Sequence, residues 1–198
     1  MQKLIIFDLG GVIIDYKGEQ YYNYLYKKTG IKYDRIVETL LPLIDKLERK
    51  KFSVREFEKE AIEKLGISAK RIDWIREFKD DSKINECVEK IVYALSKKYT
   101  VVALSNIDVG RYRATIHKYG TMGFKKIFAS CFIGTRKPDP AIYKYVLAKT
   151  GFAAKDAIFI DNQEENVNGA RKVGIKAIKF TDCISLKNAL NKNLEKNK

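Results

Sequence analysis

Four short segments of the chain carry side chains that could act together on a phosphate ester. The first is Phe7-Asp8-Leu9-Gly10-Gly11, in which a carboxylate follows an apolar run and two glycines let a ligand approach the backbone. A carboxylate at the end of a strand can attack phosphorus and form an aspartyl phosphate, but a capping Asp in a tight turn has the same pattern. This segment alone leaves both interpretations open.

Two further segments could bind the phosphoryl group. Ser105-Asn106 follows the apolar residues 101–104 and offers a hydroxyl and an amide for phosphate oxygens, although the same pair is also an ordinary helix cap. In the segment 134–140, Lys137 lies beside Pro138 and Pro140, and a proline suits the first turn of a helix. A fixed ammonium there can neutralise a nucleophilic carboxylate and a phosphoryl group together.

The fourth segment supplies a second carboxylate. It reads Asp161-Asn162-Gln163-Glu164-Glu165-Asn166 and follows the apolar residues Phe159 and Ile160. Mg²⁺ prefers few protein oxygens together with water and substrate phosphate. We therefore expect Asp8 and Asp161 to hold a magnesium ion, with Lys137 offsetting their mutual repulsion.

Continuous apolar runs precede these segments, as in strands that are buried on both faces of a parallel sheet. The expected strands are residues 4–7, 100–104, 127–133, 157–160 and 176–180. The intervening patterns predict helices over residues 85–98, 109–119, 139–150, 164–173 and 185–193. Alternating strands and helices indicate a doubly wound α/β sheet, which binds ligands at the carboxyl ends of its strands.

Residues 16–82 interrupt this alternation. They contain no convincing strand and are typical of several helices, one of which begins with the capping box Ser53-Val54-Arg55-Glu56 and ends at Gly66. We therefore predict a core domain formed by residues 1–15 and 83–198, with an all-α insertion over residues 16–82.

Composition narrows the function classes. No apolar run in the 198 residues approaches the roughly 18 needed to span a bilayer, and the N-terminus does not resemble a signal peptide. The formal charge of +14 would suit a nucleic-acid binder, but lysines are spread along the whole chain, so we expect no nucleic-acid partner. His117 is the only histidine, which disfavours zinc and His-dependent mechanisms. Three widely spaced cysteines indicate neither a disulfide framework nor a metal knuckle and suit the cytoplasm.

Taken in order, the four segments resemble those of the haloacid dehalogenase-like (HAD) hydrolase superfamily, and the resemblance covers nearly the whole chain. The string DLGGV is similar to the branch of sugar-phosphate phosphatases and the N-terminal phosphatase domain of epoxide hydrolases. The resemblance implies a Rossmann-like core, a C1-type helical cap and Mg²⁺-dependent hydrolysis of a small phosphorylated metabolite. It implies Asp8 as nucleophile with Lys137 as its catalytic partner. The implied phosphate-binding residues are Ser105, Asn106, Lys137 and Gly11, and the implied metal ligands are Asp8, the Gly10 carbonyl and Asp161.

The sequence departs from the family pattern at two positions. Most phosphatases of the superfamily have an acid–base Asp two residues after the nucleophile, where this chain has Gly10, and often an Asp where it has Asn162. Asp15 or a residue of the cap are the alternatives for the missing acid. Two other functions stay open: a haloacid dehalogenase that uses Asp8 on carbon, and a catalytically impaired domain that binds phosphate or protein.

Overall fold

The centre of the protein is a five-stranded parallel sheet. The computed structural model describes residues 2–15, 18–68 and 82–195. The strand order is β5-β4-β1-β6-β7, and every neighbouring pair is parallel. The strands are β1 (Leu4–Phe7), β4 (Thr100–Ser105), β5 (Lys126–Ala129), β6 (Ala157–Asp161) and β7 (Lys176–Lys179). Leu4 of the central β1 lies opposite Thr100 on one side and Ala157 on the other, so the functional segments after β1, β4 and β6 end at one edge.

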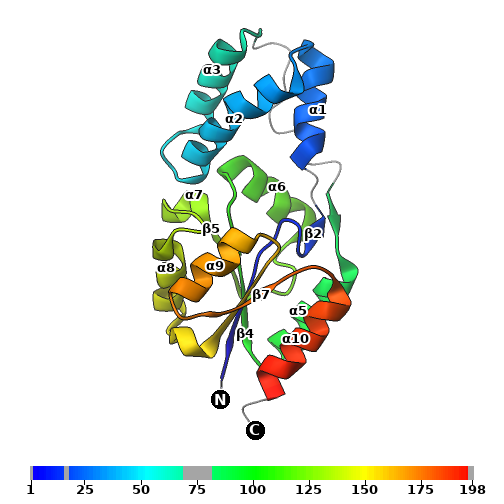
Figure 1. Cartoon of the computed structure of the whole chain (residues 1–198), viewed down its shortest axis with the longest axis vertical. Coiled ribbons are helices and arrows are strands. Elements are labelled where there is room, and N and C mark those ends of the chain that lie inside the picture. The colour runs from blue at the N-terminus through cyan, green and yellow to red at the C-terminus, as the bar shows by residue number, and fades with distance from the viewer. Residues whose placement is uncertain (1, 16–17, 69–81, 196–198) are drawn as a thin grey trace.

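Helices cover both faces of this sheet, as predicted for a doubly wound fold (Figure 1). One apolar cluster packs α5 (Glu86–Ser96) and α10 (Cys183–Glu195) against β1, and the other packs α8 (Pro140–Thr150) and α9 (Glu164–Lys172) against the opposite face. The remaining elements of the core are α6 (Val109–Tyr119), α7 (Ser130–Ile133) and the short 3₁₀ helix η2 (Ala154–Asp156). No helix in the described part of the chain combines the length and the apolar composition that crossing a membrane requires.

The expected strand over residues 127–133 is wrong in its second half. The strand β5 ends at Ala129, and Ser130–Ile133 form the single helical turn α7. The amide of Gly134, which has a left-handed backbone with φ of 88°, donates to the Ser130 carbonyl and closes this turn. The sequence misleads here because a short buried helix and a buried strand both have continuous apolar runs.

Three helices lie beyond the carboxyl edge of the sheet, at the top of Figure 1. They are α1 (Gly18–Thr29), α2 (Tyr33–Glu48) and α3 (Val54–Leu65), and they share an apolar cluster of their own. The Ser53 capping box and the left-handed Gly66 both form as predicted. We propose these helices as the inserted cap predicted for residues 16–82, of which residues 16–17 and 69–81 lie outside the described ranges.

A small ribbon marks the two crossings between core and insertion. Strand β2 (Ile14–Asp15) pairs in antiparallel fashion with β3 (Lys83–Ile84), so the departing and returning chains lie side by side. Each strand has two residues, too few for a sequence period to reveal.

The expectation that the cysteines form no disulfide is wrong. Cys87 of α5 and Cys183 of α10 are bonded, with Cα atoms 6.2 Å apart, and join two helices on the same face of the sheet. The argument for a reducing compartment therefore loses its basis in the cysteines. Cys131 is free but buried, and burial raises the pKa of its thiol to about 11, so the thiol stays protonated at neutral pH.

Candidate active site

Two carboxylates and one ammonium form a buried cluster at the carboxyl edge of the sheet. Asp8 follows β1, and Asp161 is the last residue of β6. The Nζ atom of Lys137 lies 2.8 Å from Asp8 Oδ1 and 2.7 Å from Asp161 Oδ2. The three residues are 6%, 0% and 1% exposed for Asp8, Asp161 and Lys137, so solvent screens their interactions weakly. The predicted meeting of these side chains is thus present in the geometry.

The loop that carries Lys137 is held by Asn106. The Asn106 amide donates to the Lys137 carbonyl at 2.9 Å, and its oxygen accepts the Lys137 amide at 2.8 Å. Both polar atoms of this side chain therefore contact the main chain of Lys137. Helix α6 is capped instead by Asp108, so the alternative interpretation of Ser105-Asn106 as the cap of that helix is wrong. We assign the Asn106 side chain to positioning Lys137.

The carboxylate of Asp161 is engaged on both oxygens. Its Oδ1 accepts the Gln163 amide at 2.7 Å, and its Oδ2 accepts Lys137 at 2.7 Å. The Asn166 side-chain amide donates to both oxygens, at 3.2 and 3.0 Å, and the Asn166 carbonyl in turn accepts the hydroxyl of Tyr143 at 2.7 Å. Asp161 is consequently a fixed counter-charge to Lys137 within the cluster.

Burial dominates the electrostatics of Asp8. Desolvation raises the pKa of its carboxyl from 3.8 to about 7, because the nearby Lys137 only partly offsets that penalty and Asp161 adds repulsion. Burial alone would lower the pKa of Lys137, but the two carboxylates outweigh it and the pKa is raised. Lys137 is therefore a permanent cation, shared between two acids.

A cavity of about 310 Å³ opens above this cluster. The predicted residues that line it are Asp8, Gly10, Gly11, Ser105, Asn106 and Lys137. Sequence reasoning did not single out five others as site residues: Glu48, Arg111, Arg136, Gln163 and Asn166. Asp161 does not line this cavity, whereas its neighbour Asn162 does. His117 and Asp15 are exposed and also lie outside the cavity lining.

Asn162 lines the cavity and has a buried side-chain oxygen. Its Oδ1 is buried and accepts no hydrogen bond from the described residues. The side chain lies against Gly11, whose φ of +75° and missing Cβ leave room for it: a Cβ there would come within 2.2 Å of Asn162 Nδ2. Within the described ranges, no group of three or more His, Cys, Asp or Glu side chains is arranged to hold a metal. A metal site formed by the described residues would therefore include other oxygens, such as this amide and the main chain.

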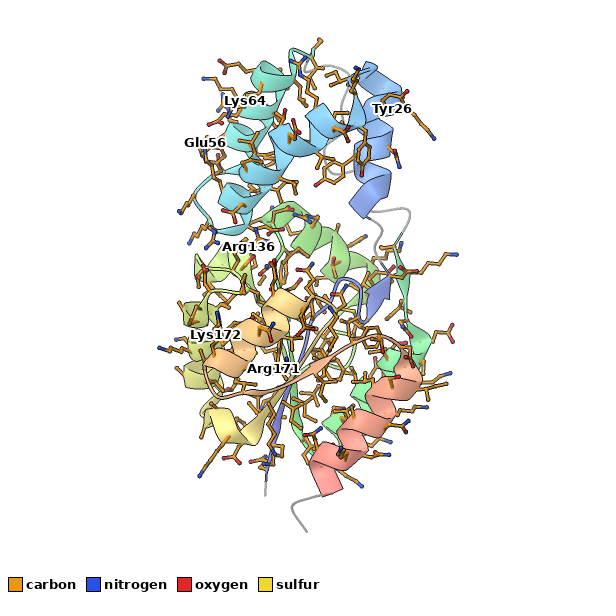
Figure 2. All side chains as sticks on the ribbon, in the orientation of Figure 1. Tyr26, Glu56, Lys64, Arg136, Arg171 and Lys172 are labelled. Carbon is orange, nitrogen blue, oxygen red and sulfur yellow. A yellow bond between two sulfur atoms is a disulfide. The ribbon has the colours of Figure 1, made fainter. Side chains whose placement is uncertain are left out.

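Charged residues join the cavity to the helices above it. Glu48, the last residue of α2, accepts Arg111 of α6 at 2.8 Å, and its Oε2 lies 3.3 Å from Arg136 Nε. Arg136, labelled in Figure 2 at the junction with the upper helices, also contacts Asp45 at 2.7 Å. Arg49 of the insertion pairs with both Asp45 and Asp139. The upper helices thus contact the core through ion pairs around the cavity.

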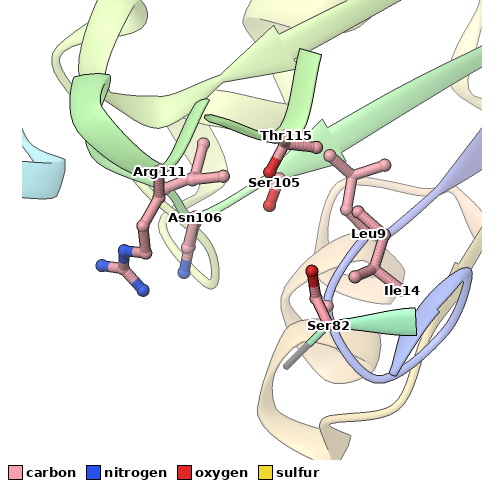
Figure 3. Close-up of a pocket in the computed structure, with 9 residues that line it drawn as sticks. Leu9, Ile14, Ser82, Ser105, Asn106, Arg111 and Thr115 are labelled. Carbon is pink, nitrogen blue, oxygen red and sulfur yellow. The ribbon is translucent and has the colours of Figure 1, made fainter. Parts of the chain in front are cut away.

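A second, smaller pocket adjoins the first. Its volume is about 90 Å³, and Figure 3 shows Ser105 and Asn106 on one side, facing Leu9, Ile14 and Ser82 on the other. Gly10, Ser105, Asn106 and Arg111 line both pockets. An apolar recess therefore lies next to the charged cavity.

These features place the chain among known proteins. A family model described as haloacid dehalogenase-like hydrolase matches residues 2–174, which is most of the chain. The chain belongs to the HAD-like hydrolases. A HAD family enzyme from Bacteroides thetaiotaomicron, solved with magnesium and inorganic phosphate, covers 91% of this chain and 95% of its own length with a TM-score of 0.77 and 24% identity. A HAD-like hydrolase from Porphyromonas gingivalis has a TM-score of 0.78 and 23% identity over 96% and 98% of the two chains. At these identities the likeness establishes the fold.

Curated relatives match shorter parts of this HAD-like hydrolase. A sesquiterpene phosphatase of Aspergillus oryzae is 40% identical over 62 residues, which is 31% of this chain and 32% of the relative. Flavin mononucleotide hydrolase 1 of Arabidopsis thaliana is 41% identical over 59 residues, or 30% and 24% of the two chains. The chain thus spans a third or less of the length of these relatives. Their names support a phosphatase-like hydrolase.

Proposed function

We propose that this protein is a Mg²⁺-dependent phosphomonoesterase that acts on a small phosphorylated metabolite through an aspartyl phosphate on Asp8. The observation that carries the proposal is a buried carboxylate at the end of β1, at the floor of a 310 Å³ cavity and 2.8 Å from a buried lysine. The names of the phosphatase relatives support the same reaction class.

In the proposed mechanism, Asp8 attacks phosphorus and the bond from phosphorus to the leaving oxygen breaks. The Leu9 amide at 2.7 Å and Lys137 at 2.8 Å both donate to Asp8 Oδ1, so we assign Oδ2 as the attacking oxygen. Ser105 and the backbone at Gly11 bind the phosphoryl oxygens, and Lys137 offsets negative charge on both nucleophile and phosphoryl group. Water then attacks the phosphorus of the aspartyl phosphate and releases inorganic phosphate.

The residues around Asp8 fit a magnesium ion. We propose Asp8, the Gly10 carbonyl and Asn162 Oδ1 as its protein ligands, because the buried Asn162 oxygen lacks a hydrogen bond from the described residues. This set replaces Asp161, which does not line the cavity, whereas Asp8, Gly10 and Asn162 do. Mg²⁺ accepts such neutral oxygens when water and substrate phosphate complete its shell, and it supplies positive charge to the phosphoryl oxygens.

The adjoining pocket limits the alcohol part of the substrate. We propose that this recess of about 90 Å³, bounded by Leu9, Ile14 and Ile107, receives a small or partly apolar group next to the phosphoryl site. A screen of phosphate esters that differ in the size and polarity of the alcohol would test this assignment.

The experiment that tests the function compares the parent protein with Asp8→Asn. Turnover of p-nitrophenyl phosphate and of a panel of small phosphate esters is measured with Mg²⁺, with Mn²⁺ and with EDTA. We expect metal-dependent turnover in the parent and none in Asp8→Asn, because the amide is a poor nucleophile of nearly the same shape. A folded Asp8→Asn protein that kept a tenth of the parent rate would refute the covalent mechanism.

The same assay separates the other functions. Chloride release from 2-haloacids in EDTA, without phosphatase turnover, would indicate a dehalogenase. Phosphate binding without turnover of any ester would indicate a binding domain that has lost catalysis.

A further inference from the structure

The cavity lacks the carboxylate that most phosphatases of this superfamily place two residues after the nucleophile. Gly10 occupies that position and contributes no side chain. Asp15, the nearest acidic alternative along the chain, is exposed and does not line the cavity. Among the described acidic residues, those that line the cavity are Asp8 and Glu48.

Glu48 lines this cavity from helix α2, whereas Asp8 lines it from the end of β1. It ends helix α2 of the insertion, directly after the cluster residue Leu47, and its side chain is 5% exposed. Arg111 holds Oε1 at 2.8 Å. The other oxygen, Oε2, is buried and accepts no hydrogen bond within the described structure, although Arg136 Nε lies 3.3 Å away. A buried carboxylate oxygen without a hydrogen bond is costly unless a ligand or water contacts it.

We propose that Glu48 is the general base of this enzyme, a role that rests on the phosphatase function proposed above. In the second half of the reaction, the oxygen of a water molecule attacks the phosphorus of the aspartyl phosphate. The bond from phosphorus to the Asp8 oxygen breaks and returns its electrons to that carboxylate, while Glu48 Oε2 accepts the proton of the water and later releases it to solvent. Arg111 and Arg136 keep the Glu48 carboxylate turned toward the cavity.

The proposal predicts a specific kinetic signature for Glu48→Gln. With p-nitrophenyl phosphate the leaving group needs little acid assistance, so the first step stays fast while hydrolysis of the aspartyl phosphate slows. Loss of general-base help typically costs about 10²–10⁴-fold in rate. We expect a stoichiometric burst of p-nitrophenolate followed by a steady rate lower by that factor, and a phosphorylated protein detectable by intact-mass spectrometry. The parent should show neither burst nor accumulated phosphoprotein.

Two further variants test whether Glu48 acts as a base or only connects the upper helices to the core. Asp45→Asn removes the other insertion carboxylate that contacts Arg136, but Asp45 does not line the cavity. It should retain the parent turnover number and show no burst. In Gly10→Asp/Glu48→Gln a carboxylate returns two residues after the nucleophile, where a Cβ meets no atom within 4 Å and the backbone is outside the left-handed region. We expect this double variant to lose the burst and to regain at least a tenfold higher steady rate than Glu48→Gln.

The outcomes are distinct. Three outcomes would each overturn the role of Glu48 while leaving the phosphatase function intact. They are the parent turnover in folded Glu48→Gln, a slow rate of Glu48→Gln without phosphoprotein, and an equal burst in Asp45→Asn. If Glu48→Gln does not fold, the single variant Gly10→Asp tests the proposal instead. If Glu48 already supplies the base, the added carboxylate should raise the steady rate less than tenfold. A larger gain would refute the proposal. Absence of both turnover and phosphoprotein in the parent would instead refute the proposed function.

Discussion

From the geometry of the buried cluster we predict that Asp8→Asn stabilises the metal-free protein at neutral pH. Removing one partner of a buried ion pair normally costs about 3–5 kcal/mol, because a buried charge is left without a partner. Here two carboxylates share one ammonium, with Lys137 lying 2.8 Å from Asp8 and 2.7 Å from Asp161. Without the Asp8 charge, Lys137 and Asp161 still form a neutral pair.

The raised pKa of Asp8 sets the magnitude and the pH window. The folded protein holds this proton up to about pH 7, whereas the unfolded chain releases it near 3.8. Between those values the folded state binds more protons than the unfolded state, so the contribution of Asp8 to stability falls as pH rises. The full difference corresponds to about 4 kcal/mol at 1.36 kcal/mol per pKa unit, and it is complete above about pH 7.

Urea unfolding in EDTA at pH 5, 6, 7 and 8 measures this effect. We expect the free energy of unfolding of Asp8→Asn minus that of the parent to increase steadily over this range, toward the higher pH. The comparison cancels the titrating groups that do not interact with Asp8, because those groups behave alike in both proteins. A difference that is the same at pH 5 and pH 8 would show that burial does not raise the pKa of Asp8.

Three further predictions address the surroundings of this cluster. Lys137→Met should lower the free energy of unfolding at pH 8 by about 3–5 kcal/mol and abolish turnover, because it leaves Asp8 and Asp161 buried together without a cation; a parent-like urea midpoint would contradict this. Gly11→Ala should lower the free energy of unfolding by about 1–3 kcal/mol and raise the Mg²⁺ concentration for half-maximal rate, since φ is +75° and the new Cβ would displace Asn162. The control Gly10→Ala should change the free energy of unfolding by less than about 0.5 kcal/mol. Cys87→Ser should lower the free energy of unfolding by about 4 kcal/mol, since the disulfide closes a loop with a sequence separation of 96 residues. Dithiothreitol should bring the parent protein to the same urea midpoint. A parent protein that is insensitive to the reductant would mean that the bond does not form.

The core and the floor of the site were predictable because each functional side chain follows a buried strand. Apolar runs locate β1, β4 and β6, and parallel strands end at one edge of a sheet. Asp8, Ser105 and Asp161 therefore had to converge, and Lys137 joins them because Asn106 holds its loop. Sequence alone did not show that Asp161 would be covered by Gln163 and Asn166, since those contacts depend on how the loop after β6 turns.

The roof of the site was not predictable for the opposite reason. Glu48, Arg111 and Arg136 belong to amphipathic or loop segments in which a charged residue ordinarily faces water. Their meeting depends on where α2 ends relative to α6, a long-range distance that no local pattern encodes. The bond between Cys87 and Cys183 was missed in the same way, because the residues are distant in sequence and adjacent only after α5 and α10 pack.

The distribution of apolar and charged contacts has a consequence for how substrate reaches Asp8. The upper helices bury their apolar residues among themselves, in the cluster that contains Leu25, Leu40 and Phe57. Their contacts with the core instead include the ion pairs of Glu48 with Arg111 and of Asp45 with Arg136. Separating the helices from the core would therefore break ion pairs while leaving the apolar clusters of each part intact. The pair of Asp45 with Arg136 is partly exposed, and pairs of this kind contribute little and weaken with salt. If the cavity admits a phosphate ester and releases its products, as proposed above, it needs such a roof, because a large apolar interface would hold it shut.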